Sequence, residues 1–287
     1  MLNIQEALNQ SNAFLAQAGI ETARLDARLL VEYALGLGSH ESSLKSEGIL
    51  QDEEYQRLQT LVTRRAKREP LAYIITEREF WSLSFKVSPA TLVPRPDSET
   101  LIEAALEYVL ERNDALTVLD LGTGSGCLLL SLLHELPHAT GVGIDRCPEA
   151  LKVARYNANQ LSLSGRASFV CADWCNGLSA SYDVVLCNPP YISNDELATL
   201  MPEVAQYEPH HALSGGVDGL ESYRAVASLI SDVLSDQGKV IFEIGMNQVA
   251  DVSQLLIQNN LQVIDIKKDL SGLPRCIVAQ SSRSKTF

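Results

Sequence analysis

The sequence predicts an α/β protein in which a seven-stranded Rossmann-like sheet, with its last strand antiparallel, follows a small N-terminal helical bundle. Two observations support this fold. Before residue 75 apolar residues recur at helical spacing, and after it apolar β-rich runs alternate with helical patterns, which is typical of a doubly wound sheet. We therefore expect a helical domain at residues 1–75, a β-hairpin linker at 76–96 and the sheet domain at 97–287.

The first domain has three apolar stripes at helical spacing, with Gly19 and Gly36 as stop signals. The stripes are Ile4, Leu8, Leu15 and Ala18; Leu25, Leu29, Leu30 and Tyr33; and Tyr55, Leu58, Leu61 and Val62. A basic run, Arg64 to Arg68, precedes Pro70. Cations solvated at a helix C-terminus, where they favour the helix dipole, explain this run better than a partner-docking patch does.

A β-hairpin is predicted from Glu79 to Ser88, where apolar and polar residues alternate, and a helix is expected to begin near Asp97. Seven apolar runs then supply the strands of the sheet. They lie at residues 117–121, 139–144, 168–171, 184–187, 239–244, 261–266 and 276–279. The segment KKDLSGLPR joins the last two runs and is too short for a helical crossover, so these strands should pair antiparallel.

Composition excludes several classes of partner. The 287 residues carry a formal net charge of -13, which repels phosphate backbones and argues against a direct nucleic-acid partner. The six cysteines contain no C-x-x-C pair, so we expect small buried side chains and no metal site. No apolar stretch is long enough to span a bilayer and no signal-peptide pattern opens the chain, so we expect a cytoplasmic protein with no membrane partner.

The segment DLGTGSG, at residues 120–126, closes one apolar strand and opens an apolar helix. Glycines let the backbone turn sharply and let a ligand lie against the chain at the carboxyl end of the strand. The pattern differs from the dinucleotide fingerprint G-x-G-x-x-G and lacks the Lys-Ser/Thr ending of a P-loop. We expect a nucleotide-like cofactor to contact this loop through Gly122, Thr123, Gly124, Ser125 and Gly126.

Two further strand ends supply polar groups for such a cofactor. Asp145 ends the next strand, where a carboxylate can accept both hydroxyls of an adenosine ribose; the alternative is a helix cap before Pro148. Asp173 offers an acceptor for an exocyclic amine, and Trp174 offers a flat face for an adenine ring. Trp174 as an ordinary core residue is the alternative.

The tetrapeptide NPPY, at residues 188–191, directly follows the fourth strand of the sheet. Its two prolines fix the loop and remove backbone donors, so carbonyl groups and the Asn188 side chain can converge on an incoming NH2 group. Tyr191 supplies a flat aromatic face. The pattern favours transfer of a methyl group from a sulfonium to a planar nitrogen over a structural Asn-Pro turn.

These residues resemble the peptide chain release factor N5-glutamine methyltransferases, also called the HemK or PrmC family. The resemblance covers nearly the whole chain, because the spaced motifs run from the N-terminal part to the C-terminal part of the sequence. They are REPLAYI, VSPATLVPRPDSE, DLGTGSG, ADW, NPPYI, EPHHAL with SGGVDGLESYR, FEIG and LPR. One departure is Cys175, where the family often has an aromatic residue; we expect it to alter packing near the adenine and not the chemistry.

The resemblance implies a Rossmann-like methyltransferase sheet, S-adenosyl-L-methionine as cofactor, S-adenosyl-L-homocysteine as product, and release factors as protein substrates recognised by the helical domain. It implies cofactor contacts at Gly122 to Gly126, Asp145, Trp174 and Asn188, to which the strand-end position adds Asp173. It implies that the substrate glutamine of a Gly-Gly-Gln motif lies along Asn188, Pro189, Pro190 and Tyr191, with Asn188, Pro189 and Tyr191 acting in catalysis.

The expected mechanism is direct in-line transfer, accelerated by positioning and needing no general base before attack. Glu208, Glu243 and Arg95 are charged candidates near the cleft, with structural roles favoured for the two glutamates. Two alternatives stay open. An NPPY loop also suits enzymes that methylate adenine N6 or guanine N2 of nucleic acids, against which the net charge argues. A non-catalytic cofactor-binding module would leave the NPPY motif without a purpose.

Overall fold

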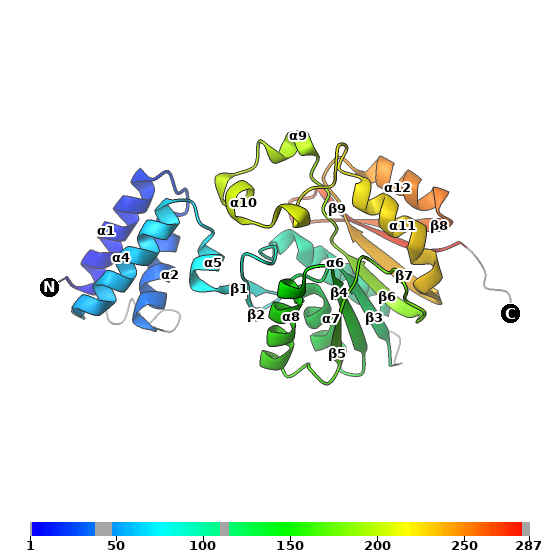
Figure 1. Ribbon diagram of the computed structural model, residues 1–287, viewed down its shortest axis with the longest axis horizontal. Coiled ribbons are helices and arrows are strands. Elements are labelled where there is room, and N and C mark those ends of the chain that lie inside the picture. The colour runs from blue at the N-terminus through cyan, green and yellow to red at the C-terminus, as the bar shows by residue number, and fades with distance from the viewer. Residues whose placement is uncertain (1, 38–47, 110–114, 283–287) are drawn as a thin grey trace. The chain divides into compact units, whose positions relative to one another are not determined.

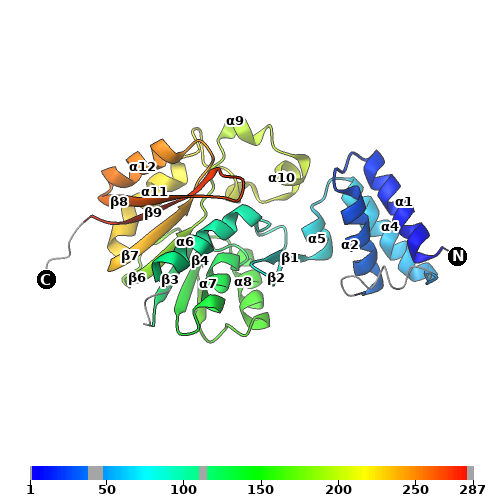
Figure 2. The same cartoon turned by 180° about the vertical axis from the view of Figure 1, so that it is seen from behind.

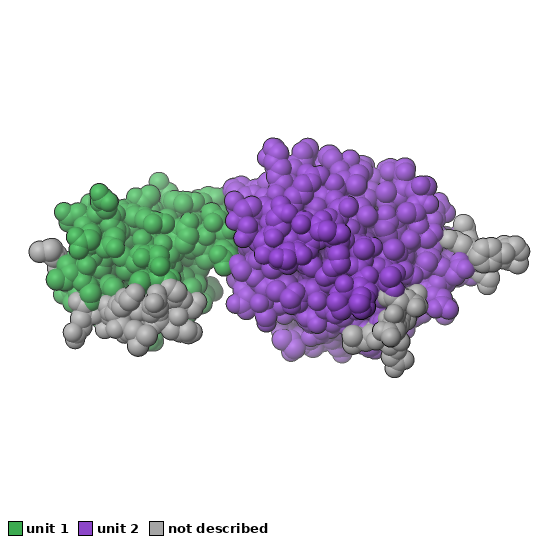
Figure 3. Space-filling view, turned by 90° about the horizontal axis from the view of Figure 1, so that it is seen from below, with its two compact units in different colours: residues 1–77, 201–207 green, residues 78–200, 208–287 purple. Residues whose placement is uncertain are grey.

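The computed structural model describes residues 2–37, 48–109 and 115–282, and the chain forms two compact units (Figures 1 and 3). Unit 1 comprises Met1–Glu77 together with Met201–Tyr207, and unit 2 comprises Arg78–Leu200 and Glu208–Phe287. A short segment from the second half of the chain therefore packs with the N-terminal helices. None of the helices among the described residues is long and apolar enough to cross a membrane.

Unit 1 is a helical bundle, as the apolar spacing predicts. Its helices are α1 (Ile4–Gln17), α2 (Ala23–Leu35), α4 (Asp52–Ala66), α5 (Leu71–Ile75) and α10 (Pro202–Tyr207). Buried Leu15, Leu30 and Leu58 form part of one core. The predicted stripe of α2 is displaced by one position, because Leu25 is 48% exposed while Asp26 is buried.

The basic run explains this displacement. The buried Arg65 donates from Nε to Asp26 Oδ2 at 2.6 Å and from Nη1 to Glu203 Oε1 of α10 at 3.1 Å. Arg68 donates to the other oxygen of Glu203 at 2.8 Å. The expectation of solvated cations is therefore wrong for Arg65, whose charge is compensated by two carboxylates inside the unit. It fits Lys67, which is exposed at the C-terminal end of α4, and Arg64, whose side chain is 40% exposed and paired to Glu69.

Unit 2 begins at the predicted hairpin, in which β1 (Glu77–Phe80) pairs with β2 (Leu83–Lys86). The two residues between the strands, Trp81 and Ser82, both have positive φ angles (53° and 56°), which matches the twist of a tight hairpin. Asn157 ties the hairpin to the sheet domain, because its amide accepts from the Lys86 N–H and donates to the Lys86 carbonyl and to the Ser125 carbonyl.

The sheet has seven strands in the order β5-β4-β3-β6-β7-β9-β8. They are β3 (Thr117–Leu121), β4 (Thr140–Asp145), β5 (Ala167–Cys171), β6 (Tyr182–Cys187), β7 (Leu234–Glu243), β8 (Leu261–Lys268) and β9 (Pro274–Ser281). The pairs from β5 to β7 are parallel, and β9 runs antiparallel to both β7 and β8. The predicted seven-stranded sheet with an antiparallel last strand is confirmed.

Helices cover both faces of the sheet (Figures 1 and 2). They are α6 (Glu99–Val109), α7 (Cys127–Glu135), α8 (Pro148–Gln160), α11 (Glu221–Val233) and α12 (Val249–Gln258). The short helices η1 (Pro96–Ser98), α9 (Asn194–Leu197) and η2 (His210–Ala212) lie in the connecting segments. Neighbouring residues of the central strand β3 belong to different cores: Val118 packs with α6 and α7, whereas Leu119 packs with α11 and α12. This period of two is the expected pattern of a strand buried on both faces.

We predict that Arg65→Ala lowers the stability of unit 1 by about 3–5 kcal/mol, because it leaves the buried Asp26 without its counter-charge and removes one of the two arginines that pair with Glu203. Arg64→Ala is the matched control, since its ion pair with Glu69 is only partly buried and contributes about 1 kcal/mol. Amide hydrogen exchange of the full chain measures the opening free energy of α1, α2 and α4 separately from unit 2. Equal effects of the two substitutions would contradict the assigned role of Arg65.

Candidate active site

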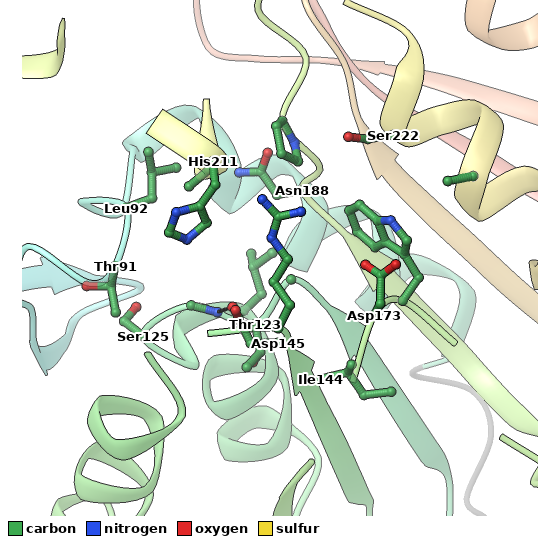
Figure 4. Close-up of a pocket in the computed structure, with 18 of the residues that line it drawn as sticks. Thr91, Leu92, Thr123, Ser125, Ile144, Asp145, Asp173, Asn188, His211 and Ser222 are labelled. Carbon is green, nitrogen blue, oxygen red and sulfur yellow. Dashed lines mark hydrogen bonds between the residues drawn. The ribbon is translucent and has the colours of Figure 1, made fainter. Parts of the chain in front are cut away.

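The candidate site lies at the carboxyl edge of the sheet in unit 2. Because β3 lies between β4 and β6 and is parallel to both, the ends of these three strands meet at one place, where the strand order changes direction. A cavity of about 770 Å³ opens there. Figure 4 shows Asp145, Asp173 and Asn188 around it, with Leu92 and His211 on the side away from Asp173.

The glycine loop closes onto the end of β4. The N–H groups of Gly122 and Thr123 both donate to the Ile144 carbonyl, at 2.9 and 2.8 Å. Gly122, Gly124 and Gly126 all have positive φ (74°, 54° and 81°), a conformation that strongly favours glycine. At Gly126 a Cβ would also lie 3.1 Å from Leu130 Cδ1. The turn therefore requires the G-x-G-x-G pattern. Four of the five expected residues, Gly122 to Ser125, line the cavity, and Gly126 does not.

Asp145 is held by backbone donors. Its Oδ2 accepts from the Gly124 N–H at 2.9 Å, and its Oδ1 accepts from the Cys147 N–H at 2.8 Å. Each carboxylate oxygen keeps a second acceptor site, so the group is both a cap for the chain and an oriented acceptor at the cavity. Asp145 can therefore cap the chain and still accept hydrogen bonds from ribose hydroxyls.

Asp173 and Trp174 line the cavity beyond the end of β5. Asp173 is exposed, and Trp174 is half-buried against the core that contains α11, with φ of 52°. Cys175, the departure from the family pattern, is 4% exposed in the same core. Burial raises the pKa of its thiol to about 11, so it is a neutral packing residue at physiological pH.

The NPPY loop contributes unequally to the cavity. Asn188 and Pro190 line it, whereas Pro189 is buried and Tyr191 is not among the lining residues. The Tyr191 hydroxyl donates instead to Glu243 Oε1 at 3.2 Å. The structure thus brings Asn188 to the edge of the cavity together with the glycine loop, and it gives the tyrosine ring a polar partner behind that edge.

Glycines behind this loop allow close packing of the chain. The Gly215 N–H donates to the Ile192 carbonyl, and the Ile192 N–H donates to the Leu213 carbonyl. A Cβ on Gly219 would lie only 2.5 Å from the Tyr191 carbonyl oxygen. The SGGVDG segment therefore packs against the NPPY loop. The sequence does not predict this contact, because the two segments are more than 20 residues apart.

Two charged candidates from the sequence pair with each other, and one of them, Arg95, lines the cavity. Glu208 is buried, accepts from the Val93 N–H at 3.2 Å and forms an ion pair with Arg95. Arg95 lines the cavity, as do Leu92 and Pro94 beside it. Glu208 thus has a structural role, since it holds the segment that precedes η1 against the segment that follows α10.

The sequence did not single out several residues that line the cavity. They are Thr91, Leu92, Ser98, His210, His211, Glu221 and Ser222. The two histidines lie within the EPHHAL motif, and Glu221 and Ser222 begin α11 within SGGVDGLESYR. Within the described part of the chain, no group of three His, Cys, Asp or Glu residues is arranged to hold a metal ion.

The seven-stranded sheet with its antiparallel last strand, glycine loop and NPPY loop defines the chain as a methyltransferase. Residues 112–266 match the family model of a methyltransferase domain, and residues 6–75 match that of the PrmC N-terminal domain. A solved methyltransferase from Pyrococcus furiosus shares the fold with a TM-score of 0.52 at 17% identity, over 76% of this chain and 97% of that one.

Two relatives identify the family. A release factor glutamine methyltransferase of Rhodospirillum rubrum is 44% identical, over 93% of this chain and 81% of the relative. One of Bradyrhizobium diazoefficiens is 41% identical, over 97% of this chain and 95% of the relative. The chain belongs to the release factor glutamine methyltransferase family.

Asp120, at the end of β3, generates a prediction about pH. It is 1% exposed, and burial raises its pKa from 3.8 to about 7, although the Thr123 hydroxyl donates to it at 2.6 Å. Between these two pH values the folded state holds a proton that the unfolded state has released, so stability falls as pH rises. We predict that Asp120→Asn removes this loss, which is on the order of 4 kcal/mol between pH 4 and pH 8.

Urea unfolding at several pH values measures this effect. Both tryptophans, Trp81 and Trp174, belong to unit 2, so tryptophan fluorescence reports that unit alone. The quantity to compare is the difference in unfolding free energy between the variant and the wild type. A difference that stays constant from pH 4 to pH 8 would show that the Asp120 pKa is not raised.

Proposed function

We propose that this chain transfers a methyl group from S-adenosyl-L-methionine to the side-chain amide nitrogen (N5) of the glutamine in the Gly-Gly-Gln motif of peptide chain release factors. The observation that supports this proposal most directly is the position of Asn188, whose amide stands at the edge of the same cavity as the glycine loop. Family membership selects the substrate, because the relatives are named release factor glutamine methyltransferases.

The lining residues fit the proposed cofactor. Asp145 presents oriented carboxylate oxygens to ribose hydroxyls, and Asp173 and Trp174 present an acceptor and an aromatic ring beyond them. The glycine loop leaves space, since a Cβ on Gly122 would lie 3.9 Å from the Asn188 carbonyl oxygen and 3.9 Å from the Trp174 ring. When bound, the cofactor supplies a methyl group on a positively charged sulfur.

The chain's own residues then position the methyl acceptor. The amide nitrogen of glutamine is planar and conjugated, so it attacks well only when its hydrogens are held and its lone pair is directed. Asn188 and the carbonyls of the proline loop supply the acceptors. Orientation of this kind can recover as much as about 7–11 kcal/mol of a barrier. The alkylated amide is strongly acidic, so its proton leaves afterwards to Asn188 or to solvent, without a prior base.

Unit 1 is proposed to grip the body of the release factor. A single flexible glutamine offers little binding energy, so a second unit that contacts the folded protein can present the loop to the cavity. The chain's net charge of -13 disfavours a polyanionic substrate, which weighs against methylation of nucleic-acid amines.

For the cofactor, we predict that S-adenosyl-L-methionine and S-adenosyl-L-homocysteine bind and that NAD does not, because the glycine loop lacks the dinucleotide spacing. Isothermal titration calorimetry with the three ligands decides between them. Tight binding of NAD with no binding of S-adenosyl-L-methionine would overturn the cofactor assignment.

For catalysis, we predict that Asn188→Ala lowers kcat by about 100-fold or more, as loss of a transition-state hydrogen-bonding group does elsewhere, while the dissociation constant of the cofactor changes much less. Asn159→Ala, at an exposed position of α8, is the control and should retain full activity. Near-normal turnover by the Asn188 variant would remove this residue from the catalytic role.

For the substrate, we predict that full-length release factor accepts labelled methyl groups, that its loop Gln→Ala variant does not, and that a short Gly-Gly-Gln peptide reacts much more slowly. The peptide lacks the protein surface that unit 1 is proposed to bind. Labelling of duplex DNA serves as the competing assay. If DNA adenine were labelled efficiently while the release factor stayed unlabelled, the nucleic-acid alternative would replace this assignment.

A further inference from the structure

Glu243, the last residue of β7, is a buried acid with two side-chain donors. It is 2% exposed. The Ser98 hydroxyl lies 2.5 Å from its Oε2, and the Tyr191 hydroxyl lies 3.2 Å from its Oε1. Ser98 is itself buried, at 3% exposure, and lies 3.3 Å from the Asn188 side-chain amide. A continuous polar chain thus leads from a buried carboxylate to the amide at the cavity.

Burial raises the pKa of Glu243; when its carboxyl group is ionised, the direction of each hydrogen bond in this chain follows from counting donors and acceptors. An ionised carboxylate only accepts, and a serine hydroxyl has one hydrogen to donate. If Ser98 gives that hydrogen to Glu243, the same oxygen must accept from Asn188. The atom of Asn188 that faces Ser98 is therefore Nδ2, and Oδ1 is directed away from it. The assignment of the amide rests on this network and not only on the positions of the heavy atoms.

The orientation matters for what the cavity accepts. An exposed Oδ1 attracts a group that carries hydrogen, such as the NH2 of a glutamine side chain. A reversed amide would offer NH2 instead and would favour a carbonyl or carboxylate oxygen, as in glutamate. An asparagine amide that is free to rotate would discriminate poorly between the two groups.

We propose that Ser98 and Glu243 are positioning residues that fix the Asn188 amide with Oδ1 toward the methyl acceptor, and so make the site selective for a planar NH2 group. This inference rests on the proposed function. Glu243 also holds the Tyr191 hydroxyl, so one carboxylate fixes both ends of the NPPY loop. The Gln248 side chain assists by donating to the Tyr191 carbonyl at 3.0 Å.

The test compares variants of Ser98 in the full-length chain. Ser98→Ala removes the acceptor of Asn188 Nδ2 and should lower kcat for release factor by about 10- to 100-fold, with KM and the dissociation constant of S-adenosyl-L-homocysteine within about twofold of wild type. Ser98→Thr keeps the hydroxyl and should restore most of kcat. Ser131→Ala is the control, because Ser131 is fully buried in α7 and its hydroxyl has no hydrogen-bond partner among the described residues.

Glu243→Gln gives a second, independent measurement. A glutamine offers one carbonyl oxygen in place of two carboxylate oxygens, so it cannot serve Ser98 and Tyr191 equally, and kcat should fall by about tenfold or more. If Ser98→Ala and Glu243→Gln both turn over release factor as fast as Ser131→Ala, the positioning role is wrong. It is equally wrong if Ser98→Thr loses as much kcat as Ser98→Ala while both still bind the cofactor product normally.

A spectroscopic measurement separates this inference from the proposed function. In the protein without substrate, the Asn188 side-chain NH2 should exchange its hydrogens with water more slowly than the same group in Ser98→Ala, as followed by nuclear magnetic resonance. If the wild type does not methylate release factor, the proposed function fails, whereas slowed exchange that depends on Ser98 still supports the orientation. Equal exchange rates in wild type and Ser98→Ala would overturn the orientation itself.

Discussion

The arrangement of three parallel strands governs the chemistry of this protein. Because β3 lies between β4 and β6 and all three run in the same direction, their carboxyl ends must meet at one edge of the sheet. That edge carries the glycine loop, Asp145 and Asn188, which are distant in sequence. We propose that the cofactor and the methyl acceptor bind next to each other at this edge, because the fold brings their binding groups together there.

Buried carboxylates hold loops and helices within each unit. In unit 2, Glu243 accepts from Ser98 and Tyr191, and Glu208 holds the backbone of Val93 and pairs with Arg95. In unit 1, Glu203 accepts from both Arg65 and Arg68. Glu208 and Glu203 have arginine partners that offset the cost of burying a charge, whereas Glu243 has hydroxyl donors and burial raises its pKa. The loops are therefore fixed by specific pairs and not by apolar packing alone.

Local patterns in the sequence were sufficient for the strands, the hairpin and the glycine loop, because each depends on residues that are close along the chain. Local patterns gave wrong or no predictions where the position of a residue depends on a partner far away in the sequence. Leu25 was expected inside, but the buried pair of Asp26 with Arg65, 39 positions away, turns α2 by one residue. The sequence did not indicate a role for Ser98, because that role depends on its hydrogen bond to Glu243, which is 145 positions away.

The central claim is that Asn188 binds the nitrogen of the methyl acceptor inside the cavity that also binds the cofactor. The most direct measurement is a crystal structure of this chain with S-adenosyl-L-homocysteine and a glutamine-containing loop of a release factor. The account predicts that the glutamine amide nitrogen lies within hydrogen-bonding distance of Asn188 Oδ1 and faces the cofactor sulfur. A glutamine bound elsewhere, or one whose carbonyl oxygen faces Asn188, would contradict it.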